Sequence, residues 1–309
     1  MWGGIHLTKI LVTDPIHEDG LKALQEFAEV EVVTGLNPAE LIEKVKGHEV
    51  LVVRSATKVT KEVIDVGKQL KVIARAGVGL DNIDVKAAEA RRIKVLNAPE
   101  APTIAVAELV LGHMLSSARH LPRADAGVKA GQWEKSKLMG TELRDKTLGI
   151  VGTGRIGRAV GYKAKAFLMN LLAHDVIQNA EFAERTGAKY VDLDVLLRES
   201  DYVTLHVPLT PKTKHMIGKR ELELMKPTAV LINTSRGGIV DEEALVEALR
   251  AGKIAGACLD VYEREPPRDS PLLKLPNVVL TPHLGASTRE AQRDAAIIIA
   301  KKVKEALVT

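Results

Sequence analysis

The sequence predicts an α/β protein with two doubly wound domains, each built on a parallel sheet. Short apolar, β-rich runs alternate with helical patterns along the chain, and a glycine-rich turn opens a second series of them. Of the 309 residues, 46% are hydrophobic but only 3% are aromatic, so Val, Leu, Ile and Ala must fill the cores. Cores of this kind suit parallel strands that are buried on both faces.

The first domain is predicted to cover residues 1–97. Apolar runs predict strands at residues 10–13, 31–33, 50–53, 71–74 and 93–96. Helical spacing predicts helices at residues 18–27, 38–46, 61–69 and 85–91. The stretch 97–102 contains two prolines and interrupts the alternation. A helix with few charges follows over residues 103–119, which predicts that much of its surface is buried.

The second domain opens with an apolar run at 148–151, followed by Gly152, Gly154 and Gly157 in the spacing G-x-G-x-x-G. Alone, this spacing fits an ordinary glycine turn equally well. The strand before it and the helix after it favour a dinucleotide-binding turn. There the first glycine permits the tight turn, the second lets a pyrophosphate approach the backbone, and the third lets helix and strand pack closely. The helix N-terminus favours the phosphate charge.

An acidic residue completes this pattern. Asp175 ends the next apolar run, near the roughly 20-residue spacing expected of a carboxylate that binds an adenosine ribose. An Asp at this place accepts hydrogen bonds from the ribose hydroxyls and repels a 2′-phosphate. Residues 176–179 contain no Arg that could hold such a phosphate. The sequence therefore predicts NAD as the cofactor, and not NADP.

Polar side chains follow the ends of the later strands. These strands are predicted at residues 189–191, 202–205, 229–232, 254–259 and 278–280, with helices at 194–198, 219–225, 241–251 and 289–307. The polar residues are Arg236, Asp260, Glu265 and His283. Ligands bind at the carboxyl ends of strands in open α/β sheets, so these side chains are expected to line one cleft.

This set of side chains suits the oxidation of a hydroxy acid. An Arg can hold the substrate carboxylate and polarise a carbonyl, a His can move the hydroxyl proton, and a carboxylate can orient the imidazole. Each residue alone has a plainer interpretation, as a surface ion pair, a cap, a solvated loop charge or part of a turn. Their joint placement at successive strand ends favours a site.

Other classes of function find little support. A net charge of +4 without a basic block argues against nucleic acid, and no apolar stretch approaches the ~18 residues of a membrane span. Residues 1–6 lack a signal pattern, and the single Cys258 excludes an internal disulfide, so a reducing, cytoplasmic location is expected. There is no G-x-S-x-G elbow. No metal site is expected, because the histidines are scattered, at His113, His120, His174, His206 and His215.

The chain resembles the D-isomer-specific 2-hydroxyacid dehydrogenases, and among them the branch that acts on phosphoglycerate. Nearly the whole chain carries the resemblance, in residues 53–60, 75–84, 105–109, 133–143, 148–157, 205–210, 233–238, 259–267 and 281–288. It implies a Rossmann NAD-binding domain at 98–283 and a flavodoxin-like substrate domain at 1–97 plus 284–309. The last helix would then cross back to the first domain, and the domains would close on substrate.

The resemblance also implies roles for single residues. Arg236, Glu265 and His283 match the catalytic arginine, glutamate and histidine, and Asp260 matches the residue that holds the nicotinamide carboxamide. The other cofactor contacts are implied at Val78, Arg155, Ile156, Val207, Pro208, Thr234, Ser235 and Gly285. Substrate contacts are implied at Arg54 for a phosphate, at Val78 and Gly79 for the carboxylate, and at Lys135 for the neighbouring subunit's site. Val78 stands where many relatives have Thr, and Lys135 where many have Arg.

The expected activity is the NAD-dependent oxidation of D-3-phosphoglycerate to 3-phosphohydroxypyruvate, the entry to serine synthesis. A homodimer or homotetramer is implied, using the helix that begins at Thr103 and the arm around Trp133. The chain ends soon after the closing helix, so feedback through a C-terminal regulatory domain is not expected. The alternatives are a glyoxylate, hydroxypyruvate or other D-2-hydroxyacid reductase and, on the same fold, a nicotinamide-sensing, corepressor-like scaffold.

Overall fold

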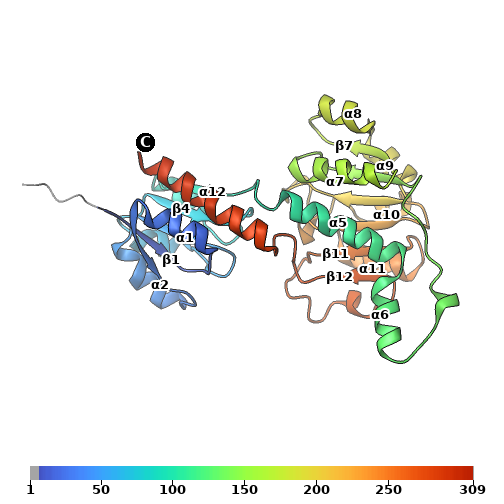
Figure 1. The fold of residues 1–309 in the computed structure, drawn as a ribbon, viewed down its shortest axis with the longest axis horizontal. Coiled ribbons are helices and arrows are strands. Elements are labelled where there is room, and N and C mark those ends of the chain that lie inside the picture. Colours follow the sequence, from blue (N-terminus) through green and yellow to red (C-terminus); the bar gives the residue numbers. More distant parts are fainter. Residues whose placement is uncertain (1–6, 309) are drawn as a thin grey trace, which may run out of the picture. The chain divides into compact units, whose positions relative to one another are not determined.

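The chain divides into two units, each with its own parallel sheet, in a computed structural model that describes residues 7–308 (Figure 1). One unit comprises Met1–Thr103 and Ala286–Thr309, and the other comprises Ile104–Gly285. The sequence placed these boundaries at 97/98 and 283/284. Residues 1–6, whose sequence lacks a signal pattern, lie outside the described residues.

The first unit contains a five-stranded parallel sheet in the order β2-β1-β3-β4-β5. Its strands are β1 Thr8–Val12, β2 Ala28–Val32, β3 Val50–Val53, β4 Val72–Arg75 and β5 Lys94–Asn97. Its helices are α1 Glu18–Gln25, α2 Pro38–Lys44, α3 Lys61–Val66, α4 Val85–Ala90 and α12 Arg289–Val308, with the 3-10 turn η1 Val45–Gly47. This is the flavodoxin-like strand order, and its switch point lies between β1 and β3.

The apolar strands of this unit bury both faces. Val50 and Val52 point to the core beneath α1 and α12, whereas Leu51 and Val53 point to the core beneath α2, α3 and α4. Side chains alternate along a strand, so an uninterrupted apolar run must be covered on both sides. The C-terminal helix α12 therefore belongs to the first unit, where it packs on α1, β4 and β5.

The second unit contains a seven-stranded parallel sheet in the order β12-β11-β10-β9-β6-β7-β8. Its strands are β6 Thr147–Val151, β7 Asn170–His174, β8 Lys189–Tyr190, β9 Tyr202–Leu205, β10 Val230–Asn233, β11 Gly256–Leu259 and β12 Val278–Leu280. Six of them, read from β8 to β11, follow the Rossmann order, and the order reverses between β6 and β9. The predicted pair of doubly wound parallel sheets is confirmed.

Helices cover both faces of this second sheet. The α-helices of the unit are α5 Thr103–Ala118, α6 Leu121–Lys129, α7 Arg155–Ala166, α8 Ala180–Thr186, α9 Leu193–Glu199, α10 Lys219–Leu224 and α11 Glu242–Arg250. Its 3-10 turns are η2 Lys135–Lys137, η3 Gly237–Ile239 and η4 Pro271–Lys274. One core lies beneath α5, α7 and α8, and the other beneath α9, α10 and α11. Within residues 7–308, no helix is both long enough and apolar enough to cross a bilayer.

Candidate active site

The glycine turn between β6 and α7 has the shape that a pyrophosphate site requires. Gly152 has a φ of 94°, and a Cβ there would lie 2.8 Å from the carbonyl carbon of His206. A Cβ on Gly157 would lie 2.0 Å from the Gly152 oxygen, so helix and turn are in close contact. A Cβ on Gly154 would meet nothing within 4 Å. The turn is therefore packed from behind and open in front, which fits a phosphate at the N-terminus of α7.

Asp175 follows β7 and is fixed across the glycine turn. Its Oδ2 accepts hydrogen bonds from the Thr153 amide at 2.6 Å and the Thr153 hydroxyl at 3.1 Å, and its Oδ1 accepts one from the Ile177 amide at 3.1 Å. Burial raises the pKa of Asp175, but these hydrogen bonds outweigh that effect and lower it. Tyr190 in turn donates to the Thr153 hydroxyl at 2.9 Å. An ionised carboxylate thus stands where a ribose acceptor is expected.

Four more predicted cofactor residues lie around this turn. Arg155 and Ile156 are the first residues of α7, so their amides belong to its free N-terminal end. Val207 and Pro208 follow β9, the neighbour of β6 at the switch point. The Val207 side chain comes within 3.0 Å of the position that a Cβ on Gly152 would take. The sheet order therefore gathers these residues at one crevice, while their individual contacts to a cofactor stay predictions.

The segment after β10 presents Arg236. The side chain of Asn233, which ends β10, accepts from the Ser235 amide and hydroxyl and donates to the Arg236 carbonyl at 2.8 Å. The Arg236 guanidinium donates to the Ser235 carbonyl at 2.7 Å. Between these residues, the buried Thr234 Oγ1 has no hydrogen-bond partner within residues 7–308. Burying a hydroxyl without a hydrogen-bond partner costs free energy, so the Thr234 hydroxyl fits a position where a bound group supplies that partner.

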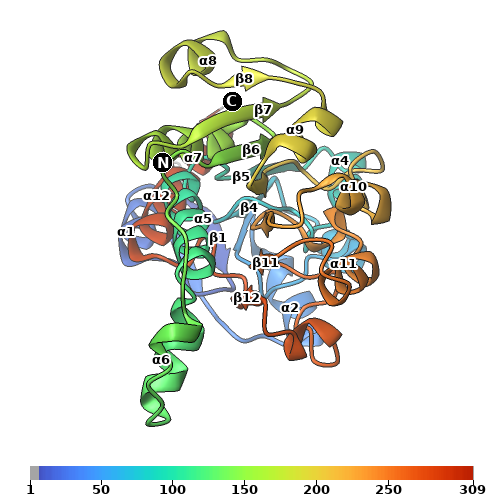
Figure 2. The same ribbon diagram turned by 90° about the vertical axis from the view of Figure 1, so that its right-hand side faces the viewer.

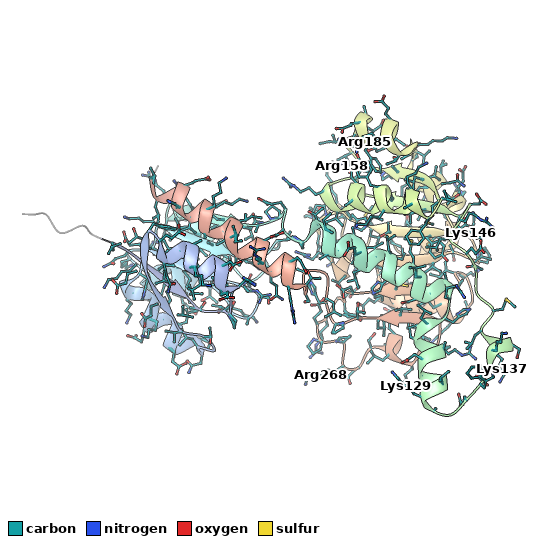
Figure 3. The ribbon with its side chains drawn as sticks, in the orientation of Figure 1. Lys129, Lys137, Lys146, Arg158, Arg185 and Arg268 are labelled. Carbon is teal, nitrogen blue, oxygen red and sulfur yellow. The ribbon has the colours of Figure 1, made fainter. Side chains whose placement is uncertain are left out.

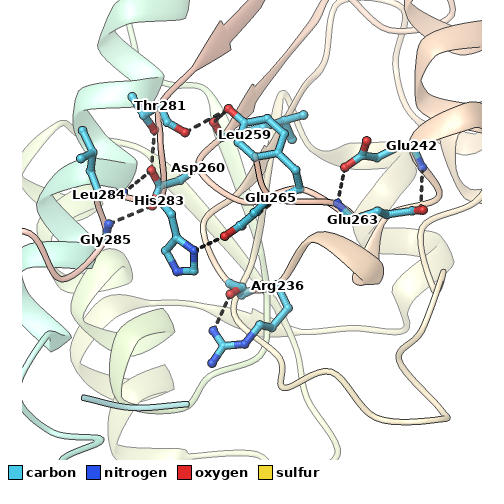
Figure 4. Close-up of polar contacts among 12 residues, drawn as sticks. Arg236, Glu242, Leu259, Asp260, Glu263, Glu265, Thr281, His283, Leu284 and Gly285 are labelled. Carbon is cyan, nitrogen blue, oxygen red and sulfur yellow. Dashed lines mark hydrogen bonds and ion pairs between the residues drawn. The ribbon is translucent and has the colours of Figure 1, made fainter. Parts of the chain in front are cut away.

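The Arg236 segment lies directly against the loop that carries Glu265. Gly237 packs so closely on this loop that a Cβ would come within 2.0 Å of the Tyr262 carbonyl oxygen. Glu265 is held by the Tyr262 amide, which donates to its Oε1 at 3.2 Å, and its Oε2 lies 2.7 Å from Nδ1 of His283 (Figure 4). The imidazole and the carboxylate remain 51% and 38% exposed, so a substrate can reach them. Arg236, Glu265 and His283 therefore come from neighbouring strand ends, as the sequence predicts.

Asp260 fixes the segment on both sides of His283. It follows β11, is fully buried and accepts three hydrogen bonds (Figure 4). Its Oδ1 accepts from Thr281 Oγ1 at 2.6 Å and from the Leu284 amide at 2.7 Å, and its Oδ2 accepts from the Gly285 amide at 2.8 Å. His283 itself has a φ of 53°, a conformation that needs such support in a residue other than glycine. The predicted contact of Asp260 with a nicotinamide stays a prediction.

In the first unit, the predicted substrate residues lie at the ends of β3 and β4. The Arg54 amide donates to Oδ2 of Asp14 at 2.6 Å, and the Arg54 carbonyl accepts from Asn82 at 2.7 Å. Val78 and Gly79 are half-buried in the loop after β4. Asp14 and Asn82 had no predicted role. The available signal for Asp14 was a carboxylate directly after a buried strand, at the switch point of this sheet.

Lys135 lies apart from these strand ends in sequence, in η2 between α6 and β6. It is next to Trp133 and Glu134 in a polar segment, and its predicted role in a neighbouring subunit stays a prediction. Among residues 7–308, no group of three or more His, Cys, Asp or Glu side chains could hold a metal ion.

Comparison with known proteins identifies the family. The model for the NAD-binding domain of the D-isomer specific 2-hydroxyacid dehydrogenases matches residues 111–285. The chain belongs to the D-isomer specific 2-hydroxyacid dehydrogenase family. The resemblance read from the sequence motifs is thus confirmed, and the unit that carries the glycine turn binds a nicotinamide dinucleotide.

Three relatives illustrate the match. D-3-phosphoglycerate dehydrogenase of Methanocaldococcus jannaschii is 54% identical over 97% of this chain and 58% of its own length. Hydroxypyruvate reductase of Thermotoga maritima is 48% identical over 96% of this chain and 97% of its own length. A crystal structure of a Thermus thermophilus protein aligns with a TM-score of 0.89 at 40% identity, covering 97% of both chains. The chain spans a little over half the length of three D-3-phosphoglycerate dehydrogenases to which it is 49% to 54% identical.

Proposed function

We propose that the chain catalyses the NAD-dependent oxidation of D-3-phosphoglycerate to 3-phosphohydroxypyruvate. The observation that carries this proposal is the 2.7 Å contact between His283 and Glu265, next to the segment of Arg236 at the open edge of a dinucleotide-binding sheet. Support for this substrate comes from relatives named D-3-phosphoglycerate dehydrogenase, at 49% to 54% identity.

His283 acts as the proton acceptor. Glu265 accepts a hydrogen bond from Nδ1–H of the imidazole, which leaves the lone pair of Nε2 free to take a proton from the substrate hydroxyl. As the C–H bond gives up its hydride and the O–H bond its proton, the C–O bond becomes a carbonyl. The proton then resides on Nε2, and the carboxylate of Glu265 stabilises the imidazolium that forms.

Arg236 binds the substrate and prepares it for this step. Its guanidinium is a permanent cation that can pair with a carboxylate in two parallel hydrogen bonds and polarise the adjacent oxygen. Bound NAD⁺ supplies the hydride acceptor. The glycine turn, Asp175 and the Thr234 hydroxyl, which has no partner in the described part of the chain, fit such a cofactor.

Arg54 binds the phosphate of the substrate, and this role allows a sharp test. Arg54→Ala should lower kcat/KM for D-3-phosphoglycerate roughly 10- to 100-fold, the range expected for one charge-assisted hydrogen-bonding group. It should leave kcat/KM for glyoxylate, which has no phosphate, within about twofold of wild type. The matched control is Lys61→Ala, which removes an exposed cation of the same unit that is paired with Asp65. Equal losses on both substrates would contradict the phosphate role.

A reductase acting on hydroxypyruvate or glyoxylate is the second candidate. It is favoured by the Thermotoga maritima hydroxypyruvate reductase, which this chain covers along 97% of its length. The same three catalytic side chains would serve in reverse, with His283 donating its proton to the carbonyl oxygen. A substrate panel at fixed cofactor concentration separates the candidates, because the reductase would turn over the unphosphorylated acids faster in wild type.

The cofactor is proposed to be NAD(H), and not NADP(H). This choice is supported by Asp175, an ionised carboxylate whose hydrogen bonds hold it at the expected ribose position. A 2′-phosphate next to it would bring two negative charges into close contact.

The second unit is proposed to associate with a second copy through α6 and the arm that follows it. Figure 2 shows α6 extending away from the rest of this unit, and Figure 3 shows Lys129 and Lys137 on the same projecting segment. Apolar side chains are exposed here, most of all Trp133 at 83% and Met139 at 84%, around a hollow of about 880 Å³. Exposed apolar surface that is gathered in one place is typical of protein–protein interaction sites. Sedimentation of the double variant Trp133→Glu, Met139→Glu should show a monomer, and an unchanged wild-type oligomer would contradict the proposal.

A further inference from the structure

A buried histidine on α5 is connected to the proposed active site. His113 lies on the buried face of α5 with 2% of its surface exposed, among Ala, Val and Met side chains. Its Nε2 lies 3.1 Å from the hydroxyl of Thr281, which follows β12. A histidine in so apolar a helix face is costly unless its polar atoms have partners. The contact with Thr281 supplies one such partner.

The direction of each hydrogen bond in this contact can be assigned. Thr281 has one hydroxyl proton, and the buried Asp260 carboxylate, at 2.6 Å, can only accept it. Because the hydroxyl proton is directed to Asp260, His113 must be the donor, as the neutral Nε2–H tautomer. Burial lowers the pKa of His113, and the charge of Asp260 offsets this only in part. The other nitrogen, Nδ1, is buried without a partner within residues 7–308, which agrees with its carrying no proton.

The same carboxylate holds the backbone around His283. Asp260 accepts the Leu284 and Gly285 amides at 2.7 and 2.8 Å, directly after His283, and the Thr281 hydroxyl before it (Figure 4). A continuous series of hydrogen bonds thus leads from α5 through Thr281 and Asp260 to the segment that presents the imidazole. Each member has its donor and acceptor directions fixed by the next.

We propose that His113 is a positioning residue for hydride transfer: its Nε2–H fixes the Thr281 hydroxyl, and so the Asp260 carboxylate and the segment that carries His283. The proposal rests on the proposed dehydrogenase function for its catalytic consequence. Its structural consequence does not depend on that function, because the conformational order of residues 281–285 can be measured without any ligand. No motif in the sequence links His113 to Thr281, which lies 168 positions further along the chain.

The test compares two substitutions of His113. His113→Leu keeps a similar volume but removes the donor, whereas His113→Gln retains an N–H that can reach the place of Nε2. Hydrogen exchange of the peptide that contains Leu284 and Gly285 should become roughly twofold to tenfold faster in the Leu variant, the range that one hydrogen bond supports. The Gln variant should exchange at nearly the wild-type rate. Met114→Ala is the matched control, since it opens the same buried face of α5 but keeps both the His113 imidazole and the Thr281 hydroxyl.

Ligand binding provides the second readout. ADP-ribose lacks the nicotinamide, so its affinity should be the same in wild type and His113→Leu, while kcat/KM for NAD⁺ falls roughly twofold to tenfold. If the Leu variant does not fold, Thr281→Val breaks the same series from its other side and Thr281→Ser restores it. In the Thr281→Val background, His113→Leu should have no further effect on exchange.

Several results would overturn the proposal. Unchanged exchange at residues 281–285 in His113→Leu is one, and an equal acceleration in Met114→Ala is another. A Gln variant as impaired as the Leu variant would refute the donor role. If wild type showed no NAD-linked turnover while the exchange pattern held, the proposed function and the catalytic consequence would fail, and only the ordering of residues 281–285 by His113 would stand.

Discussion

Gly237→Ala gives the most direct test of how the Arg236 segment and the Glu265 loop are held together. The Cβ of the new alanine would lie 1.9 Å from the carbonyl carbon of Tyr262, 2.0 Å from its oxygen and 2.5 Å from the Glu263 amide nitrogen. These are backbone atoms, so no side chain can rotate away to make room. Restoring an ordinary contact of 3.4 Å requires the loop to move by about 1.5 Å.

This shift would reach the pair formed by Glu265 and His283. The amide of Tyr262 donates to Oε1 of Glu265, and Oε2 of Glu265 contacts His283 at 2.7 Å. A misplacement of about 1 Å can reduce catalysis on the order of 100-fold. Forcing a methyl group into such a packed place also costs about 1 to 3 kcal/mol of unfolding free energy. We therefore expect Gly237→Ala to lower kcat roughly 100-fold and to remain folded.

The neighbouring glycine provides the control. A Cβ on Gly238 would meet only the Leu209 methyl groups, at 3.4 and 3.5 Å, which is ordinary contact. Gly238→Ala should therefore keep kcat and the urea midpoint close to wild type. Steady-state kinetics and urea unfolding of both variants measure these quantities. If Gly237→Ala were as active as wild type, or if both variants lost activity equally, the close packing of the two loops would not be what positions Glu265.

Three further predictions follow from single side chains. Asp175→Asn should raise the ratio of kcat/KM for NADP⁺ to kcat/KM for NAD⁺ about tenfold or more, because it removes the charge that repels a 2′-phosphate. An unchanged ratio would argue against a role of Asp175 in binding the ribose. Burial lowers the pKa of His206 from 6.5 to about 3. Between these two pH values the unfolded chain binds a proton that the folded chain does not. The free energy of unfolding therefore falls as the pH drops from 6.5 to 3. His206→Asn should flatten this dependence in urea titrations between pH 6.5 and pH 3, by up to about 1.4 kcal/mol per pH unit. Glu265→Gln should lower kcat about 100-fold, because the Gln side-chain amide no longer selects the Nδ1–H tautomer of His283. Calorimetry should find that the affinity of this variant for NAD⁺ stays within about twofold of wild type.

Much of the fold could be predicted because the strands are buried on both faces. An apolar run such as Val50–Val53 predicts a strand by itself, and the glycine turn indicates the start of the second sheet. Two helices were not predicted. In α6 no residue is buried, and its few apolar side chains, such as Leu121 and Val128, stand among charged and small residues, so its helical pattern is weak. The helix α8 did have signals, an Asn179 cap and Gly187 in the left-handed conformation at its end.

The site was predictable only where it follows the strand ends. Arg236, Glu265 and His283 lie in the loops that follow β10, β11 and β12, so topology alone indicated that they lie at one edge of a sheet. Asp14 also follows a strand end, so this rule could have found it, although its contact with Arg54 could not be predicted. His113 lies on a helix and carries no such signal. The partners of these two residues, Arg54 and Thr281, lie 40 and 168 residues away in the chain, and such contacts depend on packing that no local pattern encodes.

The central claim is that the strand-end imidazole accepts the substrate proton during hydride transfer. The most direct measurement is NADH formation from D-3-phosphoglycerate by wild type and by His283→Ala, with NAD⁺ binding measured in parallel. The account predicts that His283→Ala binds NAD⁺ as wild type does but loses about 100- to 10,000-fold in kcat. Wild-type turnover by His283→Ala would contradict it.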